Sequence, residues 1–462
     1  MEFEVTMADI AKLPRKAAQN LCKRCNLNPP EITMRHEALC RDCFQIYIRT
    51  KFTRHMEPYR VKKHSQTTKK LLLATSLGVS STVLLDTLHW HRALQVERAR
   101  RSEYDVYVVH IDETAVTGDV STNTSSSSTD ADTITTDQCL EKLKERYTQF
   151  EFIKVPLEEI YTISGSTATA TTLVDEIIST TSEISIDPTT TTSSSSSSAL
   201  LESQPPRSKL RTLLSSLNSR ASQMDLINIL RTRLIIELAK QRDCEAIFFA
   251  DSMTKMAAMV LAEVTKGRGH ALPWLISDGP TPYGPAKIVR PFRELSKSEI
   301  ISYTTFTSLW PYSIISQETA TSPQKPPIKA KNQTIDEIML KFFDDVSNAH
   351  LSTNVVKTAA KLEFADDRDR IERLGLCEIC GLPMDEDPRV RRLRSVIRAD
   401  GEGGEGSSGG GSGNGSIVGD ADARIYCLEP PAGEEGLKER RCYGCRRSTL
   451  GAGKIDWPVN NR

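Results

Sequence analysis

The stretch LLLATSLGVSSTVLLDTL, residues 71–88, decides the fold. Its apolar start over 71–75 predicts a buried strand, and the apolar spacing over Ser80–His89 predicts a helix. A loop with one glycine and several hydroxyl side chains joins the two. Backbone N–H groups at such a junction form a nest that binds phosphate, although a turn of this kind is also ordinary architecture. The candidate cofactor-binding residues of this loop are Ser76, Gly78, Ser80 and Ser81.

Strand and helix patterns alternate outward from this stretch. Ser296 and Glu299 have the spacing of a capping box and predict the start of another helix. The alternation favours an α/β fold with a doubly wound parallel sheet that helices cover on both faces. The further strands are expected at Tyr104–Ile111, Phe150–Val155, Ala246–Ala250 and Lys287–Arg290, and the further helices at Gln223–Lys240 and Met253–Thr265.

Local composition divides the chain into four regions. Two insertions rich in Ser and Thr, at 113–136 and 162–210, bury too little apolar surface to offset the entropy of ordering them, so we expect disorder there. The Gly/Ser tract at 401–418 is predicted to be a flexible linker. The regions are 1–68 (cysteine pairs and a basic segment), 69–312 (the α/β domain), 313–376 (a linker, then helix) and 377–462 (a second cysteine module).

The overall composition excludes some classes of protein. The 462 residues contain 60 Lys plus Arg against 60 Asp plus Glu, so net charge neither indicates nor excludes a nucleic-acid partner. We find neither a signal-peptide pattern nor an apolar run long enough to span a bilayer, and we expect a cytoplasmic protein without membrane contact. Eight of the 11 cysteines fall in four C-x2-C pairs, which favours metal sites over disulfides in a reducing compartment.

The first two cysteine pairs have the spacing of a zinc ribbon. Four thiolates in two tight knuckles complete a tetrahedral zinc site, and such a closed site leaves no open position for catalysis. No histidine occupies a ligand spacing. The alternative is a chance set of buried cysteines. The predicted structural zinc ligands are Cys22, Cys25, Cys40 and Cys43.

The last two pairs are predicted to share a second metal site. Between Cys380 and Cys442 lie 61 residues, but the Gly/Ser tract falls in this gap and long loops close at a slowly growing entropic cost. Zinc and an iron–sulfur cluster are both compatible with four thiolates, and Cys427 is a possible substitute ligand. The predicted ligands are Cys377, Cys380, Cys442 and Cys445.

A basic, aromatic-containing segment follows the first knuckles and predicts contact with RNA phosphates. Phe44, Tyr47 and Phe52 are interleaved with the charges, where they either pack on the ribbon or stack on a base. A second basic turn ends a helix later in the chain, and its alternative role is to complement the helix dipole. The predicted RNA-binding residues are Lys51, Arg54, Lys62 and Lys63 in the first cluster and Lys266 and Arg268 in the second.

Taken in order, these segments resemble the cytoplasmic tRNA 2-thiolation protein 2 family. Residues 71–88 are similar to the SGGxDS region of tRNA-thiolating ATPases of the pyrophosphate-loop type, whose fold is adenine nucleotide alpha hydrolase-like. The resemblance covers about 20–112, 220–312 and the two late knuckles. The matching segments include the ribbon, DLINILRTRL, FFADSMTKMAAMVLAEVTKGRG, LPW, IVRPFRELSKSEI, CEIC and CYGC.

The loop departs from the active pattern of that family. Its second position is glycine in SGGxDS, which lets the backbone approach a phosphate, but here it is Leu77. Ser80 replaces the aspartate of the motif, and Asp251-Ser252-Met253-Thr254 replaces an asparagine–aspartate cluster. Cys244, the cysteine expected nearest the loop, is interpreted as an inert core residue. We therefore expect no catalytic residue in this chain, and the sequence leaves open whether the loop retains ATP.

The resemblance implies a non-catalytic subunit of a heterodimer that 2-thiolates the wobble uridine of cytosolic tRNAs. The partner would be the catalytic pyrophosphate-loop thiolase subunit, and the sulfur would come from a thiocarboxylated ubiquitin-like carrier. This chain would contribute tRNA binding and assembly. Two alternatives remain: an ATP-using thiolase active on its own, and a zinc-ribbon adaptor in ubiquitin-like conjugation (protein urmylation) that does not contact RNA.

Overall fold

The computed structural model describes most of the predicted α/β domain and both cysteine modules. Lys63, Cys427, the 401–418 tract and most of the two insertions lie outside the described residues. The described ranges are 21–34, 37–62, 67–116, 135–165, 205–314, 333–345, 349–362, 375–384 and 441–449.

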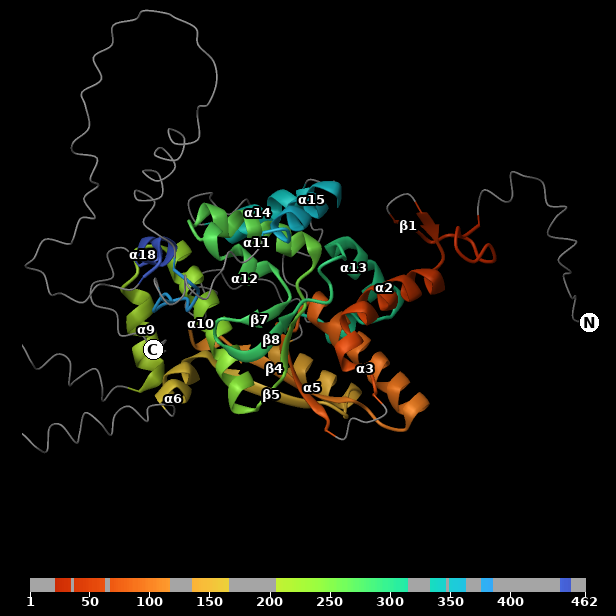
Figure 1. Ribbon diagram of the computed structural model, residues 1–462, viewed down its shortest axis with the longest axis horizontal. Helices are drawn as coiled ribbons and strands as arrows, with labels where there is room; N and C mark the ends of the chain where they lie inside the picture. The colour runs from red at the N-terminus through yellow and green to blue at the C-terminus, as the bar shows by residue number, and fades with distance from the viewer. Residues whose placement is uncertain are drawn as a thin grey trace, which may run out of the picture.

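A six-stranded sheet forms the centre of the molecule (Figure 1). β3 (Lys69–Thr75), the first of its parallel strands in the chain, lies between β4 (Tyr104–Asp112) and β6 (Ala246–Phe249). This arrangement confirms the predicted doubly wound fold and places the loop after β3 at the switch point, where such sheets bind ligands. The full order is β5-β4-β3-β6-β8-β7, with β5 at Glu151–Pro156, β8 at Gly284–Val289 and an antiparallel edge strand β7 at Gly279–Thr281.

Side chains of the central strand alternate between two hydrophobic cores. Leu71 and Leu73 lie in one core with helices α2, α3, α5 and α13, and Leu72 lies in the other with α6, α9 and α10. This alternation follows from the two-residue period of a strand. The helices are α2 (Arg41–His55), α3 (Val79–Ala99), α5 (Thr136–Arg146), α6 (Ile160–Gly165), α9 (Pro206–Ser215), α10 (Arg220–Gln241) and α13 (Lys297–Phe306).

The N-terminal ribbon shares the first core with the α/β domain. The short strands β1 (Ile32–Met34) and β2 (Glu37–Leu39) pair as a hairpin, and α2 follows directly. One face of α2 buries Phe44, Ile48 and Phe52, four residues apart, in the core that α3 and α13 also line. The expected boundary at residue 68 therefore does not separate two independently packed units.

A further group of helices lies next to β7 and β8 in Figure 1. Their buried residues form a third core around Met256, Ala257 and Phe343. α11 (Met253–Thr265) begins and ends where the sequence predicts, and Ser296 and Glu299 form the expected capping box of α13. The remaining helices are α12 (Leu272–Ile276), α14 (Ile335–Asp345), α15 (Ala349–Ala359) and α18 (Tyr443–Ser448), with short 3-10 helices at Glu57–Tyr59, Leu157–Glu159, Gly269–Ala271 and Trp310–Tyr312.

The second insertion is shorter than the sequence suggests. α6 continues to Gly165 and α9 begins at Pro206, so both ends of the expected 162–210 segment are helical. α9 buries Leu210, Leu213 and Leu214, whose spacing is helical. Among the described helices, none has both the length and the apolar character to cross a membrane.

Candidate functional site

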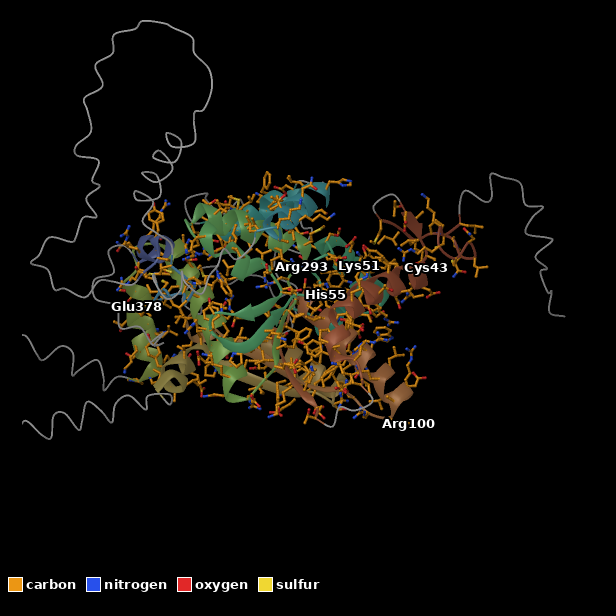
Figure 2. All side chains as sticks on the ribbon, in the orientation of Figure 1. Cys43, Lys51, His55, Arg100, Arg293 and Glu378 are labelled. Carbon is orange, nitrogen blue, oxygen red and sulfur yellow. The ribbon has the colours of Figure 1, made fainter. Side chains whose placement is uncertain are left out.

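The first four cysteines come together at one end of the molecule (Figure 2, near Cys43). Cys22 and Cys25 form the knuckle before β1, Cys40 caps the start of α2, and Cys43 lies in its first turn. The hairpin register pairs Ile32 with Leu39, which carries the second knuckle back to the first. All four sulfurs lie within 4.8 Å of one another.

The geometry of this cluster fits one tetrahedral ion. A zinc–sulfur bond of about 2.3 Å places neighbouring sulfurs about 3.8 Å apart, and the Sγ atoms of Cys25 and Cys40 are 3.7 Å apart. Burial opposes ionisation of Cys22, but hydrogen bonds from the backbone N–H groups of Cys25, Cys40 and Arg24 lower its pKa to about 6. Burial and the neighbouring thiols raise the pKa of Cys43, as expected when groups that ionise to like charges are held close together.

The last four cysteines form a second cluster at the opposite end (Figure 2, near Glu378). Their sulfurs also lie within 4.8 Å of one another, and those of Cys380 and Cys442 are 3.9 Å apart. The structure thus brings together two knuckles that are far apart in the chain, as predicted. All four side chains are buried, whereas two of the four are half-buried in the first cluster.

The loop after β3 is closed by the chain itself. Leu77 has a positive φ of 59°, a conformation that favours glycine, and its side chain is fully buried in the first core. Its N–H donates to Thr75 Oγ1 (3.1 Å), and its carbonyl accepts the N–H of Ile314 (2.7 Å). The segment after α13 is held there by a second hydrogen bond, from Thr82 Oγ1 to the carbonyl of Tyr312 (3.2 Å).

The predicted cofactor-binding residues surround this closed turn. Ser76 is exposed, Gly78 and Ser80 are half-buried, and Ser81 is buried with its hydroxyl donating to the carbonyl of Gly78 (2.9 Å). Gly78 caps α3 with a φ of −80°, which any residue can adopt. The conformation that favours glycine is therefore found at Leu77, where the chain has no glycine, and not at Gly78.

The acidic residue that follows β6, Asp251, forms ion pairs with basic side chains of the same chain. Asp251 is buried and forms ion pairs with Lys255 (2.8 Å) and Arg290 (3.4 Å). Burial raises the pKa of Asp251, but the two cations outweigh that effect and lower it. Ser252 caps α11 by accepting the N–H of Lys255. These side chains stabilise the carboxyl end of the sheet.

Two buried cysteines outside the clusters have raised pKa values. Burial raises the pKa of Cys244 to about 11, in agreement with its interpretation as a core residue. Cys139 was not singled out from the sequence, although its Sγ lies 3.3 Å from the carbonyl of Tyr312, in the segment that covers the loop. Burial raises its pKa as well, so neither thiol is suited to act as a nucleophile.

The first basic cluster lies on α2 and on the residues after that helix. Arg54 and Lys62 are exposed, whereas Lys51 is half-buried and paired with Glu294. Figure 2 shows Lys51 near His55 and Arg293, both of which bind Asp278, at 3.3 and 3.4 Å. These ion pairs fix α2 on the residue before β7 and on the loop between β8 and α13.

A shallow pocket of about 350 Å³ lies on the outer side of α2. The guanidinium of Arg49 stacks over the indole of Trp90, with 4.8 Å between Cζ and the ring centre. Phe44 and Phe52 are core residues and do not line this pocket. The lining residues are Ile46, Arg49, Thr50, Thr53, Arg54, Glu57 and Trp90.

The second basic cluster is buried, which corrects the prediction that it contacts tRNA phosphates. The side chains of Lys266 and Arg268 are 8% and 3% exposed. Both bind Asp225, Lys266 at 3.1 Å and Arg268 Nη1 at 3.0 Å. Glu263 binds both as well, at 3.0 and 3.2 Å. Asp225 interrupts the apolar face of α10, and an acid in that position was the signal that could have indicated a buried partner.

Comparisons with known proteins agree on one family. A family model described as cytoplasmic tRNA 2-thiolation protein 2 matches residues 334–447. A protein of that name from Sclerotinia sclerotiorum is 34% identical over 336 residues, which are 73% of this chain and 80% of that protein. Another from Pyrenophora tritici-repentis is 29% identical over 370 residues, 80% of this chain and 86% of that protein.

A search of solved structures found the U34-tRNA thiolase NcsA from Methanococcus maripaludis with its 4Fe-4S cluster. That match covers 82% of this chain and 96% of the other, with 13% sequence identity and a TM-score of 0.44. The extent and identity of the sequence matches decide the assignment. The chain belongs to the cytoplasmic tRNA 2-thiolation protein 2 family.

Proposed function

We propose that this chain is the non-catalytic subunit of a heterodimer that 2-thiolates the wobble uridine of cytosolic tRNAs. Its family supports a role in tRNA 2-thiolation and a cytoplasmic location. The observation that carries the non-catalytic assignment is the closed turn after β3, in which both backbone polar groups of Leu77 already have partners.

A phosphate-binding loop needs backbone N–H groups that are directed at the ligand. At Leu77 the N–H is bonded to Thr75 and the carbonyl to Ile314. Opening the turn would break these bonds and expose a leucine side chain that is 0% exposed, which costs about 1.5–3 kcal/mol for the apolar burial alone. Asp251 is likewise neutralised by two cations. These features support a subunit that does not itself activate the uridine.

The division of labour follows from this assignment. The catalytic partner would use ATP to adenylate O2 of the uridine, with release of pyrophosphate. The thiocarboxylate sulfur of a ubiquitin-like carrier would then attack C2 and displace AMP, and hydrolysis of the acyl–sulfur bond would leave the sulfur on the uridine and a carboxylate on the carrier. This chain would supply tRNA surface and the scaffold for assembly. It offers no reactive cysteine for the sulfur step among Cys139, Cys244 and the eight clustered thiols, because the former are inert and the latter form closed sets.

The exposed side of α2 is the best-supported tRNA surface. Arg54 and Lys62 present charge to solvent there, and Arg54 lines the pocket formed with Arg49 and Trp90. An arginine stacked on an aromatic ring is a platform on which an unpaired base can stack. Lys51 adds positive charge at the edge of this surface but is shared with Glu294. Lys266 and Arg268 are not part of it.

Each four-cysteine cluster is proposed to hold one structural zinc ion. The sulfur spacings of 3.7 and 3.9 Å match a single tetrahedral ion. A four-iron cluster binds each thiolate to a different iron and therefore spaces the sulfurs more widely. Metal analysis of the full chain distinguishes the two: zinc at both sites supports the proposal, and iron with acid-labile sulfide at the second site would replace it there.

The functional proposal is tested by mass spectrometry of tRNA nucleosides from cells that lack this protein. We expect wobble 2-thiouridine to disappear and to return with a rescuing copy. A copy in which Ser76 and Ser80 are both alanine should rescue equally well, because the loop is not used for catalysis. Unchanged 2-thiouridine in the deletion would exclude the pathway and favour an adaptor that does not act on tRNA.

A further inference from the structure

The second four-cysteine cluster is assembled against two buried arginines of the α/β domain. Gly381 directly follows Cys380, and a Cβ atom built on it would lie 2.4 Å from Nη1 of Arg233. Gly444 lies between Cys442 and Cys445, and its Cβ would lie 2.5 Å from Cγ of Arg268. Each knuckle thus has a glycine at the point where an arginine side chain packs against it.

The charge of Arg268 is already matched by carboxylates. It binds Asp225 and Glu263, and Ser448 of α18 donates a hydrogen bond to Asp225 Oδ2 (2.7 Å). This network joins α18 to α10 and α11. The role of Arg268 is therefore to dock the second knuckle on the domain.

Arg233 is in a different electrostatic position. Its side chain is 4% exposed, and its carboxylate contact with Glu237 spans 3.9 Å, close to the limit of an ion pair. The guanidinium lies over the ring of Tyr283 (4.8 Å), whose hydroxyl donates to the carbonyl of Cys380 (2.9 Å). A buried cation is stabilised by nearby anions that offset its desolvation, and thiolates that hold a metal beside Gly381 would add negative charge to that of Glu237.

We propose that Arg233 is a positioning residue of the second metal site, and that its guanidinium offsets the negative charge of the four thiolates. A divalent ion with four thiolates carries a net charge of roughly −2, which is costly to bury without a cation. Metal binding and docking of the two knuckles on α10 are therefore coupled through Arg233. The inference goes beyond the proposed role in thiolation and does not depend on tRNA.

The first cluster provides the internal reference for this inference. It is half-exposed at Cys25 and Cys43, so solvent can screen its charge. Its neighbouring arginine, Arg24, has a 40% exposed side chain and pairs with Glu37 at 3.4 Å. Loss of the Arg233 charge should consequently affect the second cluster and leave the first unchanged.

The test compares zinc binding by the full-length chain and its Arg233→Met, Arg233→Lys and Arg242→Met variants. Zinc affinity is measured by competition with a chromophoric chelator. Hydrogen exchange of peptides covering 375–384 and 441–449 then assigns the change to the second site, with 21–44 as the reference. Arg242 is the matched control because it follows α10 and pairs with Glu151 on the surface.

Arg233→Met should weaken zinc binding at the second site by about 10- to 100-fold, the usual effect of a lost outer-sphere partner. Arg233→Lys should restore most of the affinity, and Arg242→Met should behave as wild type. If Arg233→Met does not fold, Arg233→Gln replaces it, with the same expectation. Wild-type zinc affinity and exchange protection in the neutral variant would mean that Arg233 only fills space, and would overturn the proposal.

Discussion

The two four-cysteine sites use the same ligands but differ in how they are built. The first gathers its cysteines from 22 consecutive residues and lies at the N-terminal end of α2, where Figure 1 shows β1 apart from the sheet. The second joins residues 375–384 to 441–449, and it packs against α10 and the turn after α11. The difference indicates that the first site is assembled from one continuous segment, whereas the second connects distant parts of the chain.

The largest expected effect follows from removing a ligand at each site. Cys442→Ser should release one of about two metal ions per chain and expose 375–384, 441–449 and the adjoining part of α10 to hydrogen exchange, because structural zinc contributes on the order of 10 kcal/mol to such modules. Cys25→Ser should also release one ion, but the gain in exchange should stay within 21–44. Equal spread of exchange in the two variants would remove the distinction between the sites.

Asp225→Asn should have the next largest effect, because it removes the shared partner of Lys266 and Arg268. Loss of one member of a buried ion pair costs about 3–5 kcal/mol. Burial raises the pKa of Asp225, but Arg268 and Lys266 outweigh that effect and lower it to about 2. The carboxylate thus stabilises the fold fully above its unfolded pKa of about 3.9 and loses that contribution as the pH falls towards 2.

The measurement is denaturant unfolding of wild type and Asp225→Asn between pH 7 and pH 2.5. The difference in unfolding free energy should be constant near neutrality and shrink below about pH 4. Asp105→Asn is the control, since the carboxylate of Asp105 is 58% exposed and pairs on the surface with Arg92. A difference that persists unchanged to pH 2.5 would contradict the assigned ion network.

A smaller effect is expected from a methyl group placed between the second knuckle and the domain. In Gly444→Ala the new Cβ would lie 2.9 Å from the carbonyl oxygen of Lys266, a backbone atom that cannot rotate away. Such overpacking costs about 1–3 kcal/mol. Gly269→Ala is the matched control, because its Cβ would meet only Val264, at 3.7 Å. Thermal unfolding of both variants tests this, and equal melting temperatures would mean that the knuckle does not pack as described.

The smallest effect concerns the surface near the first site. Arg54→Glu should weaken tRNA binding and make the slope of log affinity against log salt less negative by about 1, as for a lost phosphate contact. Arg100→Glu, an exposed change at the far end of α3 (Figure 2), should leave both unaltered. Filter binding at several salt concentrations measures the slope. Identical slopes for Arg54→Glu and wild type would remove α2 from the tRNA surface.

Local patterns in the sequence were sufficient to predict most of the sheet. The apolar patterns of β3, β4 and α11 depend on residues that are close together in the chain. The sequence alone was therefore sufficient to predict where these elements lie. The second cysteine cluster was also predictable despite its long gap, because four thiolates have few other roles in a reducing compartment.

The failures of prediction share a physical cause. The charges of Lys266 and Arg268 resemble an RNA-binding turn until their partner Asp225 is known, and that partner lies more than 40 residues away on another helix. Packing of α2 on the α/β domain was missed for the same reason. Its apolar residues Phe44, Ile48 and Phe52 repeat every four positions, but the sequence does not reveal which surface they meet.

The central claim is that a pyrophosphate-loop domain with a closed loop supports thiolation without performing it. The most direct test is ATP-dependent formation of 2-thiouridine on a substrate tRNA by the purified, metal-loaded chain, alone and mixed with its catalytic partner and a thiocarboxylated carrier. The account predicts no product from the chain alone and product when the partner is present. Thiolation by the chain alone, abolished by Ser76→Ala or Ser80→Ala, would contradict it.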